Sequence, residues 1–382
     1  MARVLPFPAL LSTLDARLQP EQGSGTAGRS PQPSHVRPLL EAPDPAAELG
    51  RQRASGALLR DARPALYLLE LLPEGAASSR AAPVRYLLCG LAQDGAEPLE
   101  HSPYVPRCAQ VEPAVTLAAD DHGVLRELLA EAAERSVLVW HGSFDGWQLS
   151  LKRIEPAEIT RRLQAALDEA PLRPLSALDE RAPSLAAIVA LSDPGLHLAP
   201  VHRAIRNLDT FNEDTFLRLA GGYARSYDLT EPLTSPGGLE AARERLATLI
   251  TGHHAVLLVL PQGRGRILRF RQGLDLAHIR AVPRNPPLRS LDLALLNALV
   301  LRTVLGIQDP ETPGHPNVFA VHSLEELVEE VERGTYQVGF GLNPPPVWEV
   351  RAVMEASATL PSRTLRVSPM PPAGLLFLDR DT

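Results

Sequence analysis

The sequence contains few of the residues that form disulfide frameworks and metal centres. Only two of its 382 residues are cysteines, Cys89 and Cys108, which is too few for a disulfide scaffold or a cysteine-based zinc site. One bridge between them is compatible with the sequence, but we favour two buried free thiols, because free cysteine packs as a small hydrophobic residue. No spacing of His, Asp and Glu is typical of a metal centre either. We therefore expect no metal and no cofactor.

Long apolar runs, aromatic residues and an excess of positive charge are also scarce. No apolar run reaches the roughly 18 residues that a membrane-spanning helix needs, so we expect no membrane contact. The net charge is −7, the pI is about 5.9 and no basic patch dominates, which argues against a nucleic-acid partner held through its phosphates. The opening MARVLPFPALLSTL resembles a weak signal peptide, but Pro6 and Pro8 interrupt it. We interpret it as an opening strand of a cytoplasmic protein.

The remaining composition is that of a globular protein. Hydrophobic residues make up 45% of the chain and aromatic residues 4%, so the core must consist mainly of Leu, Val and Ala. The chain contains 37 prolines, about twice the usual frequency of ~5%, which stiffens many loops. Residues 19–45 are rich in Gly, Ser, Pro and Gln and are expected to form a flexible loop. The length is typical of about two domains.

Periodicity of the apolar residues predicts alternating strands and helices. Period-two or continuous apolar runs predict strands at 65–71, 85–91, 137–140, 148–154, 185–191, 196–205, 255–260, 264–270, 317–321, 338–342, 365–367 and 374–379. Pro200 interrupts the strand at 196–205. Helical spacing predicts helices at 46–59, from 122 onward, from 155 onward, at 212–219, around 239–250, at 290–305, from 323 and from 347. The fold class is therefore α/β to α+β, with a mixed sheet and packed helices. We expect two closely associated subdomains, an N-terminal α+β subdomain at 1–172 and a C-terminal α/β subdomain at 173–382.

Residues 336–374 combine a strand, a proline turn, a helix, a polar loop and a second strand, about the length of one βαβ unit. Asn343 ends the first strand and opens the proline turn, and Ser362, Arg363 and Thr364 lie in the polar loop. Free N–H groups at a helix start and an arginine fork are suited to an anion. The simpler alternative is a helix start followed by a solvated loop.

His202 and Arg203 form a second candidate pair, in the strand predicted at 196–205. Histidine can transfer a proton and arginine can clamp a phosphate or carboxylate, whereas the simpler alternative is a strand with outward polar residues. Other polar groups have structural interpretations. We assign Asp120 and Asp121 to a helix cap, Asp145–Gly146 and Gly263–Gly265 to hairpin turns, and His253–His254 to the region after a helix C-terminus.

Several segments in this order resemble the domain-of-unknown-function family 1015 of bacteria and archaea, which is also labelled SerC-like. The segments are RVLPFPAL, ASGALLRDARPALYLLEL, DPGLHLAPVHRAIRN, LDLALLNALVLRTVLGI and LNPPPVWEVRAV with LPSRTLRVSPMPPAGL. The resemblance covers nearly the full length. The family's Ala-Asp-Gly-His-His-Arg-like motif is missing from this chain. The corresponding residues 174–183 read PLSALDERAP and contain no His pair. An expected His-Glu pair corresponds only to Glu100–His101, and Arg363 stands where the family carries lysine.

These observations lead to two main functional hypotheses. The first is a divergent, non-catalytic small-molecule-binding or regulatory module, a pseudoenzyme that kept the scaffold. The alternative is an enzyme of the phosphotransferase or phosphohydrolase type that acts on a phosphorylated or carboxylated metabolite. Both hypotheses predict an anionic small molecule as partner, held by His202, Arg203, Asn343, Ser362, Arg363 and Thr364. The sequence leaves the catalytic residues and the oligomeric state open.

Overall fold

The structure is a computed structural model that describes most of the chain. The described residues are 2–12, 42–75, 82–93, 109–110, 113–119, 123–175, 183–248, 254–274, 276, 279, 282–312, 314–358, 360–361 and 363–379. Cys108, Glu100–His101, Asp120–Asp121, His253 and Ser362 lie outside them, as does most of the predicted loop at 19–45. The described part contains mixed strand pairing and packed helices, as the sequence predicts, and none of its helices has the length and apolarity to cross a membrane.

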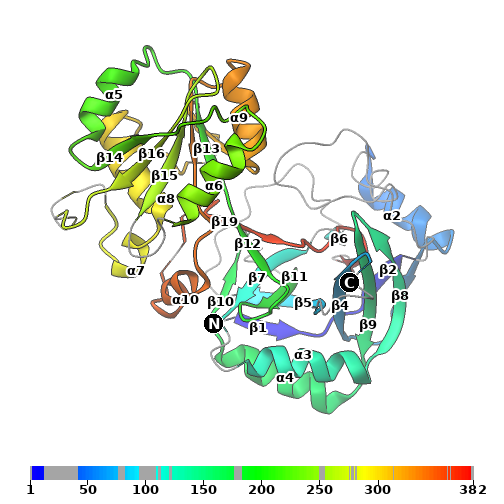
Figure 1. Ribbon diagram of the computed structural model, residues 1–382. Coiled ribbons are helices and arrows are strands. Elements are labelled where there is room, and N and C mark those ends of the chain that lie inside the picture. Colours follow the sequence, from blue (N-terminus) through cyan, green and yellow to red (C-terminus); the bar gives the residue numbers. More distant parts are fainter. Residues whose placement is uncertain are drawn as a thin grey trace. The chain divides into compact units, whose positions relative to one another are not determined.

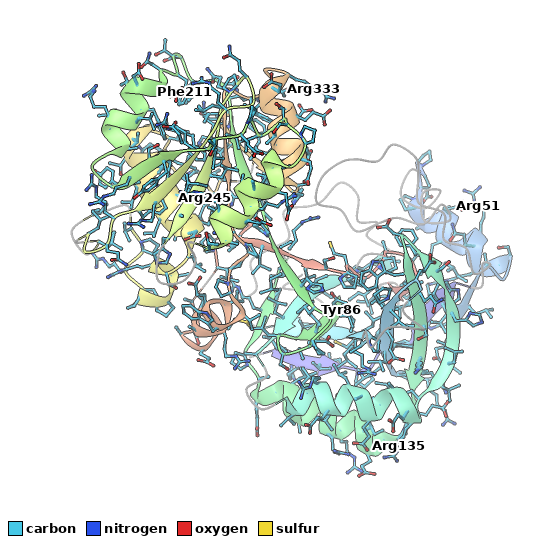
Figure 2. The ribbon with its side chains drawn as sticks, viewed as in Figure 1. Arg51, Tyr86, Arg135, Phe211, Arg245 and Arg333 are labelled. Carbon is cyan, nitrogen blue, oxygen red and sulfur yellow. The ribbon has the colours of Figure 1, made fainter. Side chains whose placement is uncertain are left out.

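Two compact units make up the fold. One comprises Met1–His197 together with Ser368–Thr382, and the other comprises Leu198–Val367. The sequence placed the boundary at 172/173, but β10 (Leu172–Pro174) pairs with β7 (Ala114–Ala118) and belongs to the first unit. The C-terminal segment also joins the first unit, where the hydroxyl of buried Tyr86, labelled in Figure 2, donates to the carbonyl of Pro369 at 2.7 Å.

An eight-stranded sheet forms the frame of the first unit (Figure 1). Its order is β10-β7-β11-β5-β4-β9-β8, and β1 (Ala2–Leu5) also pairs with β5. The further strands are β4 (Leu66–Pro73), β5 (Val84–Gln93), β8 (Val137–Phe144), β9 (Trp147–Ile154) and β11 (Ser184–Ala190). The pairing is antiparallel except between β7 and β11, so the sheet is mixed. Cys89 of β5 is a buried free thiol, and burial raises its pKa.

Two helices and a small sheet complete the first unit. Helices α3 (Val124–Arg135) and α4 (Ala157–Glu169) lie side by side and bury their leucine stripes against the large sheet, while Arg135 stays at the outer surface (Figure 2). The small sheet has the order β3-β2-β20-β6. It consists of β2 (Ala9–Ser12), β3 (Leu58–Arg60), β6 (Ala109–Gln110) and β20 (Leu376–Asp379), next to α2 (Pro45–Ala54).

The second unit is built on a six-stranded sheet in which every neighbouring pair is antiparallel. Its order is β14-β16-β15-β18-β13-β17. The strands are β13 (His202–Ile205), β14 (Ala224–Asp228), β15 (Ala255–Val259), β16 (Gly265–Phe270), β17 (Val318–Val321) and β18 (Val338–Gly341). The central strands are buried on both faces, which explains their continuous apolar sequences.

Helices cover both faces of this sheet (Figure 1). One face packs against α6 (Gly238–Thr248) and α9 (Leu324–Glu332), and the other against α5 (Glu213–Ala220), α8 (Asp292–Leu295) and η3 (Leu296–Val304). Helix η3 is a π-helix, and α7 (Pro286–Arg289) precedes α8. The buried helix predicted at 290–305 is thus present but changes from α to π geometry within its length.

Local turn chemistry agrees with several predictions. Asp145–Gly146 and Gln262–Gly263 have positive φ angles. The first pair forms the two-residue turn of the hairpin β8–β9. The second pair lies in the loop of the hairpin β15–β16, where the Leu260 N–H donates to the Arg264 carbonyl at 2.9 Å. The Asn212 side chain accepts from the Thr215 N–H at the start of α5, the helix predicted at 212–219, and so caps its N-terminus. These turns and caps depend on neighbouring residues only, so sequence chemistry is sufficient to predict them.

Tertiary packing chooses strand partners that the sequence does not indicate. The strand predicted at 196–205 with an interruption at Pro200 is divided there into β12 (His197–Pro200) and β13, and these two strands lie in different sheets. Residues 336–374 have about the length of a βαβ unit but do not form one. β18 belongs to the six-stranded sheet, while β19 (Leu365–Ser368), which follows α10 (Val347–Glu355), pairs with β12.

Gly339 in β18 gives a test of this packing. A Cβ atom there would lie 2.8 Å from Leu327 Cδ1 of α9, whereas one at Gly222 would have its nearest neighbour, the Leu219 carbonyl oxygen, at 3.6 Å. We expect Gly339→Ala to lower the free energy of unfolding by about 1–3 kcal/mol through overpacking, and Gly222→Ala to have a smaller effect. Denaturant unfolding of both variants checks this. Equal losses would contradict the close approach of α9 to β18.

Candidate functional site

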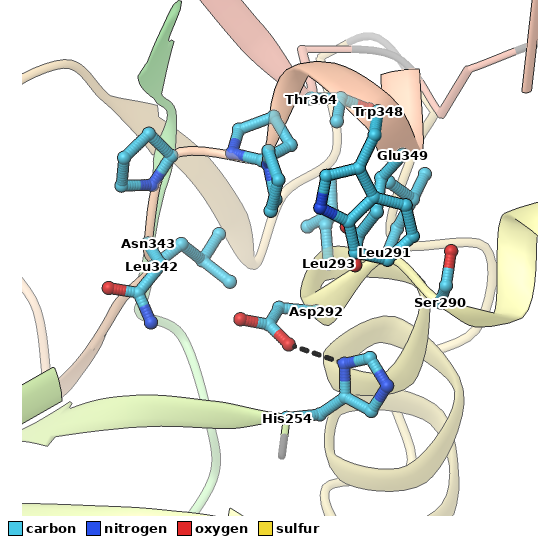
Figure 3. Close-up of a pocket in the computed structure, with 13 residues that line it drawn as sticks. His254, Ser290, Leu291, Asp292, Leu293, Leu342, Asn343, Trp348, Glu349 and Thr364 are labelled. Carbon is cyan, nitrogen blue, oxygen red and sulfur yellow. Dashed lines mark hydrogen bonds and ion pairs between the residues drawn. The ribbon is translucent and has the colours of Figure 1, made fainter. Parts of the chain in front are cut away.

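The second unit contains a pocket of about 200 Å³ beside the carboxyl end of β18. Four segments line it: the turn from β18 into α10, the start of α8, the residue that precedes β15, and Thr364 in the loop after α10 (Figure 3). Leu291, Leu293, Leu342, Pro344–Pro346 and Trp348 provide the apolar lining, and the polar lining consists of His254, Ser290, Asp292, Asn343, Glu349 and Thr364. Polar groups that converge inside an apolar pocket are typical of a ligand site.

Strand pairing explains why these segments meet. β15 and β18 are antiparallel with Leu257 opposite Gly341, so His254, just before β15, lies near the residues that leave β18. The prolines that follow Asn343 end the strand and direct the chain into α10, which starts with Pro346 as its N-cap. Glu349 is in the first turn of this helix. A sheet register and a proline turn thus place the polar groups.

Asp292 and His254 form an ordered pair. The His254 Nδ1 atom lies 2.9 Å from the Asp292 Oδ1 atom (Figure 3), and this interaction raises the pKa of His254. Asp292 also accepts hydrogen bonds from the Ala255 backbone and the Asn343 side chain, but its burial dominates and raises its pKa. The carboxyl orients the imidazole ring and favours a proton on Nδ1.

Glu349 is the least compensated group in the pocket. The residue is 8% exposed, and its carboxyl has no hydrogen-bond or ion-pair partner among the described residues. Burial, followed by the negative charge of Asp292, raises its pKa to about 7. A carboxyl with this pKa gains or loses its proton near neutral pH. A small change in its surroundings is then sufficient to change its charge.

Of the six residues selected from the sequence, Asn343 and Thr364 line this pocket. Asn343 Nδ2 donates to the Leu246 carbonyl at 3.3 Å, and the Thr364 hydroxyl donates to the Pro361 carbonyl. Arg363 is exposed and has a positive φ angle, and Ser362 lies outside the described residues. The polar loop and the proline turn therefore meet, although the two segments are separated by α10.

His202 and Arg203 are buried side chains that hold neighbouring backbone in place. His202 is 5% exposed, and its Nδ1 accepts from the Leu342 N–H at 3.0 Å. Burial and nearby Arg203 lower its pKa to about 4, so it is neutral at physiological pH. Its ring thus fixes the backbone immediately before Asn343 and supports the wall of the pocket.

Arg203 has a comparable role on the opposite face of β13. Its guanidinium donates to the Val201 carbonyl at 2.9 Å and to the Arg363 carbonyl at 3.1 Å, and burial lowers its pKa to about 10. Successive side chains of a strand point to opposite faces, so His202 and Arg203 do not converge on one ligand. Arg203 connects β13 to the loop that carries Thr364.

Asp292, His254 and Glu349 were not selected from the sequence. We placed His254 only after a helix C-terminus, and Asp292 and Glu349 fall inside apolar helical patterns. A single carboxyl at the start of a helix that is otherwise apolar on all sides was the available signal for Asp292, because buried carboxylates need a partner. Nothing in the spacing indicates that Glu349 faces it.

No family model matches the chain, and no curated protein matches it. Among solved structures, the chain is similar to a conserved hypothetical protein from Pyrococcus furiosus, with 12% identity, 71% of this chain and 81% of that chain covered, and a TM-score of 0.33. It is also similar to a free serine kinase in complex with AMP, with 11% identity, 74% and 96% coverage, and a TM-score of 0.31. These scores are too low to support a functional argument, so the proposals below rest on the geometry of the pocket.

The hydrogen bond from Leu342 to His202 gives a stability prediction. We expect His202→Ala to cost about 1–3 kcal/mol, because it leaves the buried Leu342 N–H unpaired, and His197→Ala, at an exposed position, to cost little. The folded-state pKa of His202 is depressed, so its contribution is present above pH 6.5 and is lost as pH falls toward 4. Urea unfolding of the wild type and of His202→Ala between pH 4 and 7.5 should therefore show that their free energies of unfolding converge as the pH falls. A constant difference would rule out a neutral buried His202.

Glu349 should have the opposite pH dependence. Its folded-state pKa is raised from 4.5 to about 7, so the stability linked to its proton is present below pH 4.5 and is lost as pH rises through 7. We expect Glu349→Gln to equal the wild type near pH 4.5 and to be more stable by roughly 3 kcal/mol at pH 8. Exposed Glu355→Gln on the same helix is the matched control and should show no such trend. A Glu349→Gln variant that is no more stable at pH 8 would show that the carboxyl is well solvated.

Proposed function

We propose that the protein is a small-molecule-binding module whose site is the pocket lined by His254, Asp292 and Glu349. The observation that carries this proposal is the Glu349 carboxyl, which lies in a pocket and has no partner among the described residues. Burying a polar group without a hydrogen bond is unfavourable, so folded proteins keep such groups mainly where they serve a ligand or a reaction. The volume of about 200 Å³ lies below that of drug-sized ligand sites and limits the ligand to a small molecule.

The ligand class expected from the sequence was an anion. Among the described residues that line the pocket there is no arginine or lysine. Support for an anion would come from Thr364, from protonated His254 and from Arg363, whose backbone is held beside Thr364 by Arg203. Two carboxyls in the same lining oppose an anion by charge repulsion. The pocket therefore supports small-molecule binding more strongly than it supports an anionic ligand.

A second candidate function is acid–base catalysis on a small metabolite. It is a broader class than the enzyme expected from the sequence, a phosphotransferase or phosphohydrolase that acts on a phosphorylated or carboxylated metabolite. The specific observation is the combination of an Asp–His pair with a carboxyl whose pKa is about 7. Groups that titrate near the working pH are effective general acids and bases. In this reaction His254 would exchange a proton with the substrate while Asp292 orients its ring, and Glu349 would be the complementary acid.

Membership of the domain-of-unknown-function family 1015 and a cytoplasmic location remain proposals of the same kind. They are supported by the order of the sequence segments and by the free thiol of Cys89, since disulfides are rare in reducing compartments.

A thermal-shift screen tests the binding function. The library should contain amines, carboxylates, phosphates, nucleotides and neutral aromatic compounds, because a ligand that binds the folded state raises the melting temperature by mass action. We expect at least one class to shift the wild type and not Ser290→Trp, which places bulk at the lining of the pocket. Ser143→Trp, which changes a different surface pocket in the first unit, should keep the shift. The proposal fails if no compound binds, or if Ser290→Trp binds as the wild type does.

A further inference from the structure

The charges of the pocket indicate which kind of head group it accepts. Asp292 is paired with His254, and a protonated imidazole cancels the charge of that carboxylate. Ionised Glu349 then has one uncompensated negative charge in a residue that is 8% exposed. A buried carboxylate is stable only with a proton or a cation beside it. Either a proton or a positively charged ligand group can therefore fill this role at Glu349.

The charged groups around Glu349 leave its carboxylate available to a positively charged ligand group. The titratable groups that face it are Asp292 from α8 and His254 from the segment before β15. Arg289 is the charged residue of α7, which packs against α10, and its guanidinium donates to the carbonyls of Pro283 and Arg284 at 2.7 Å. Arg289, the arginine of α7, is therefore hydrogen-bonded to backbone carbonyls instead of Glu349.

The rest of the pocket is suited to an apolar body with a cationic end. Trp348 precedes Glu349 in α10, lines the same pocket and is 65% exposed, and Figure 3 draws both side chains among the residues of the lining. An exposed indole face next to a carboxyl is a recurrent arrangement for ammonium recognition, because the ring face attracts cations. Leu291, Leu293 and the prolines of the turn provide apolar contacts for the remainder of the ligand.

We propose that the ligand is a small primary amine with an apolar body, whose ammonium group replaces the proton on Glu349 and lies beside the Trp348 indole. This inference rests on the proposed binding function. The exchange is balanced: the amine enters as an ammonium ion, the neutral Glu349 carboxyl becomes a carboxylate that accepts its N–H donors, and one proton passes to solvent. Asp292 keeps His254 in place and is not part of the exchange.

Proton release gives a measurement that ordinary structural effects do not imitate. Titration calorimetry with 2-phenylethylamine, in buffers that differ in ionisation enthalpy, should show about one proton released per ligand at pH 6 and nearly none at pH 8.5. The affinity should rise by about tenfold from pH 5 to pH 6, because the ligand competes with a proton. The matched neutral and anionic probes are 2-phenylethanol and 3-phenylpropionate, and both should bind at least tenfold more weakly at pH 8.

Variants separate the two contacts of the ammonium group. Glu349→Gln should weaken 2-phenylethylamine binding at least tenfold at pH 8 and abolish the proton release that accompanies binding at pH 6, while Glu355→Gln should match the wild type at both pH values. Trp348→Leu should weaken binding about two- to fivefold and retain proton release. Circular dichroism at each pH shows that the variants are folded.

The possible outcomes distinguish this inference from the function on which it rests. Tighter binding of 3-phenylpropionate, with proton uptake, would overturn the amine class and leave a small-molecule site in place. Binding of 2-phenylethylamine that is unchanged in Glu349→Gln would also overturn it. If none of the three probes binds and the thermal-shift screen finds no ligand, both proposals fail together.

Discussion

The candidate site depends on the backbone pairing of β18 between β13 and β15. This antiparallel register puts the residue before β15 next to the residues that leave β18. Gly339 allows it, because α9 approaches the strand so closely that Leu327 occupies the space of a side chain. The His202 ring then accepts from Leu342 at the end of β18. The pocket wall is therefore positioned by main-chain hydrogen bonds within the centre of a sheet, which is among the most rigid parts of a fold.

Burial determines the chemistry of this wall. His202 and Glu349 are both removed from water, and in each the neutral form is favoured, so the pKa of the imidazole falls and that of the carboxyl rises. The difference between them lies in their partners. His202 has its hydrogen bond to backbone and a structural role, whereas Glu349 has no partner among the described residues and faces a pocket. Two similar shifts thus have different meanings, and the geometry decides which group is available to a ligand.

Much of the local structure was predictable, because the relevant signals lie within a few residues. The caps at Asn212 and Ser323, the hairpin turns at Asp145 and Gln262, and the proline turn after Asn343 all have sequence signatures with a direct physical cause. The sequence also singled out the segments around His202 and Arg363, and Arg203 connects these two segments by a hydrogen bond to the Arg363 carbonyl. Their roles were not visible, because a strand pattern does not show that His202 and Arg203 face opposite layers of helices.

By itself the sequence determined many of the helices and strands, several turns and the α/β to α+β class, since periodicity and turn chemistry are local properties. It did not indicate the strands β3, β7 and β14. Only the tertiary structure decided how the strands are shared between the two units, with the C-terminal strand β20 joining β2 and β6 at the other end of the chain. It also decided the site. Asp292, His254 and Glu349 come from three distant segments, each with a plain local interpretation. Their shifted pKa values and the pairing of Asp292 with His254 arise only when packing excludes water and brings the three groups together. No local sequence pattern predicts this.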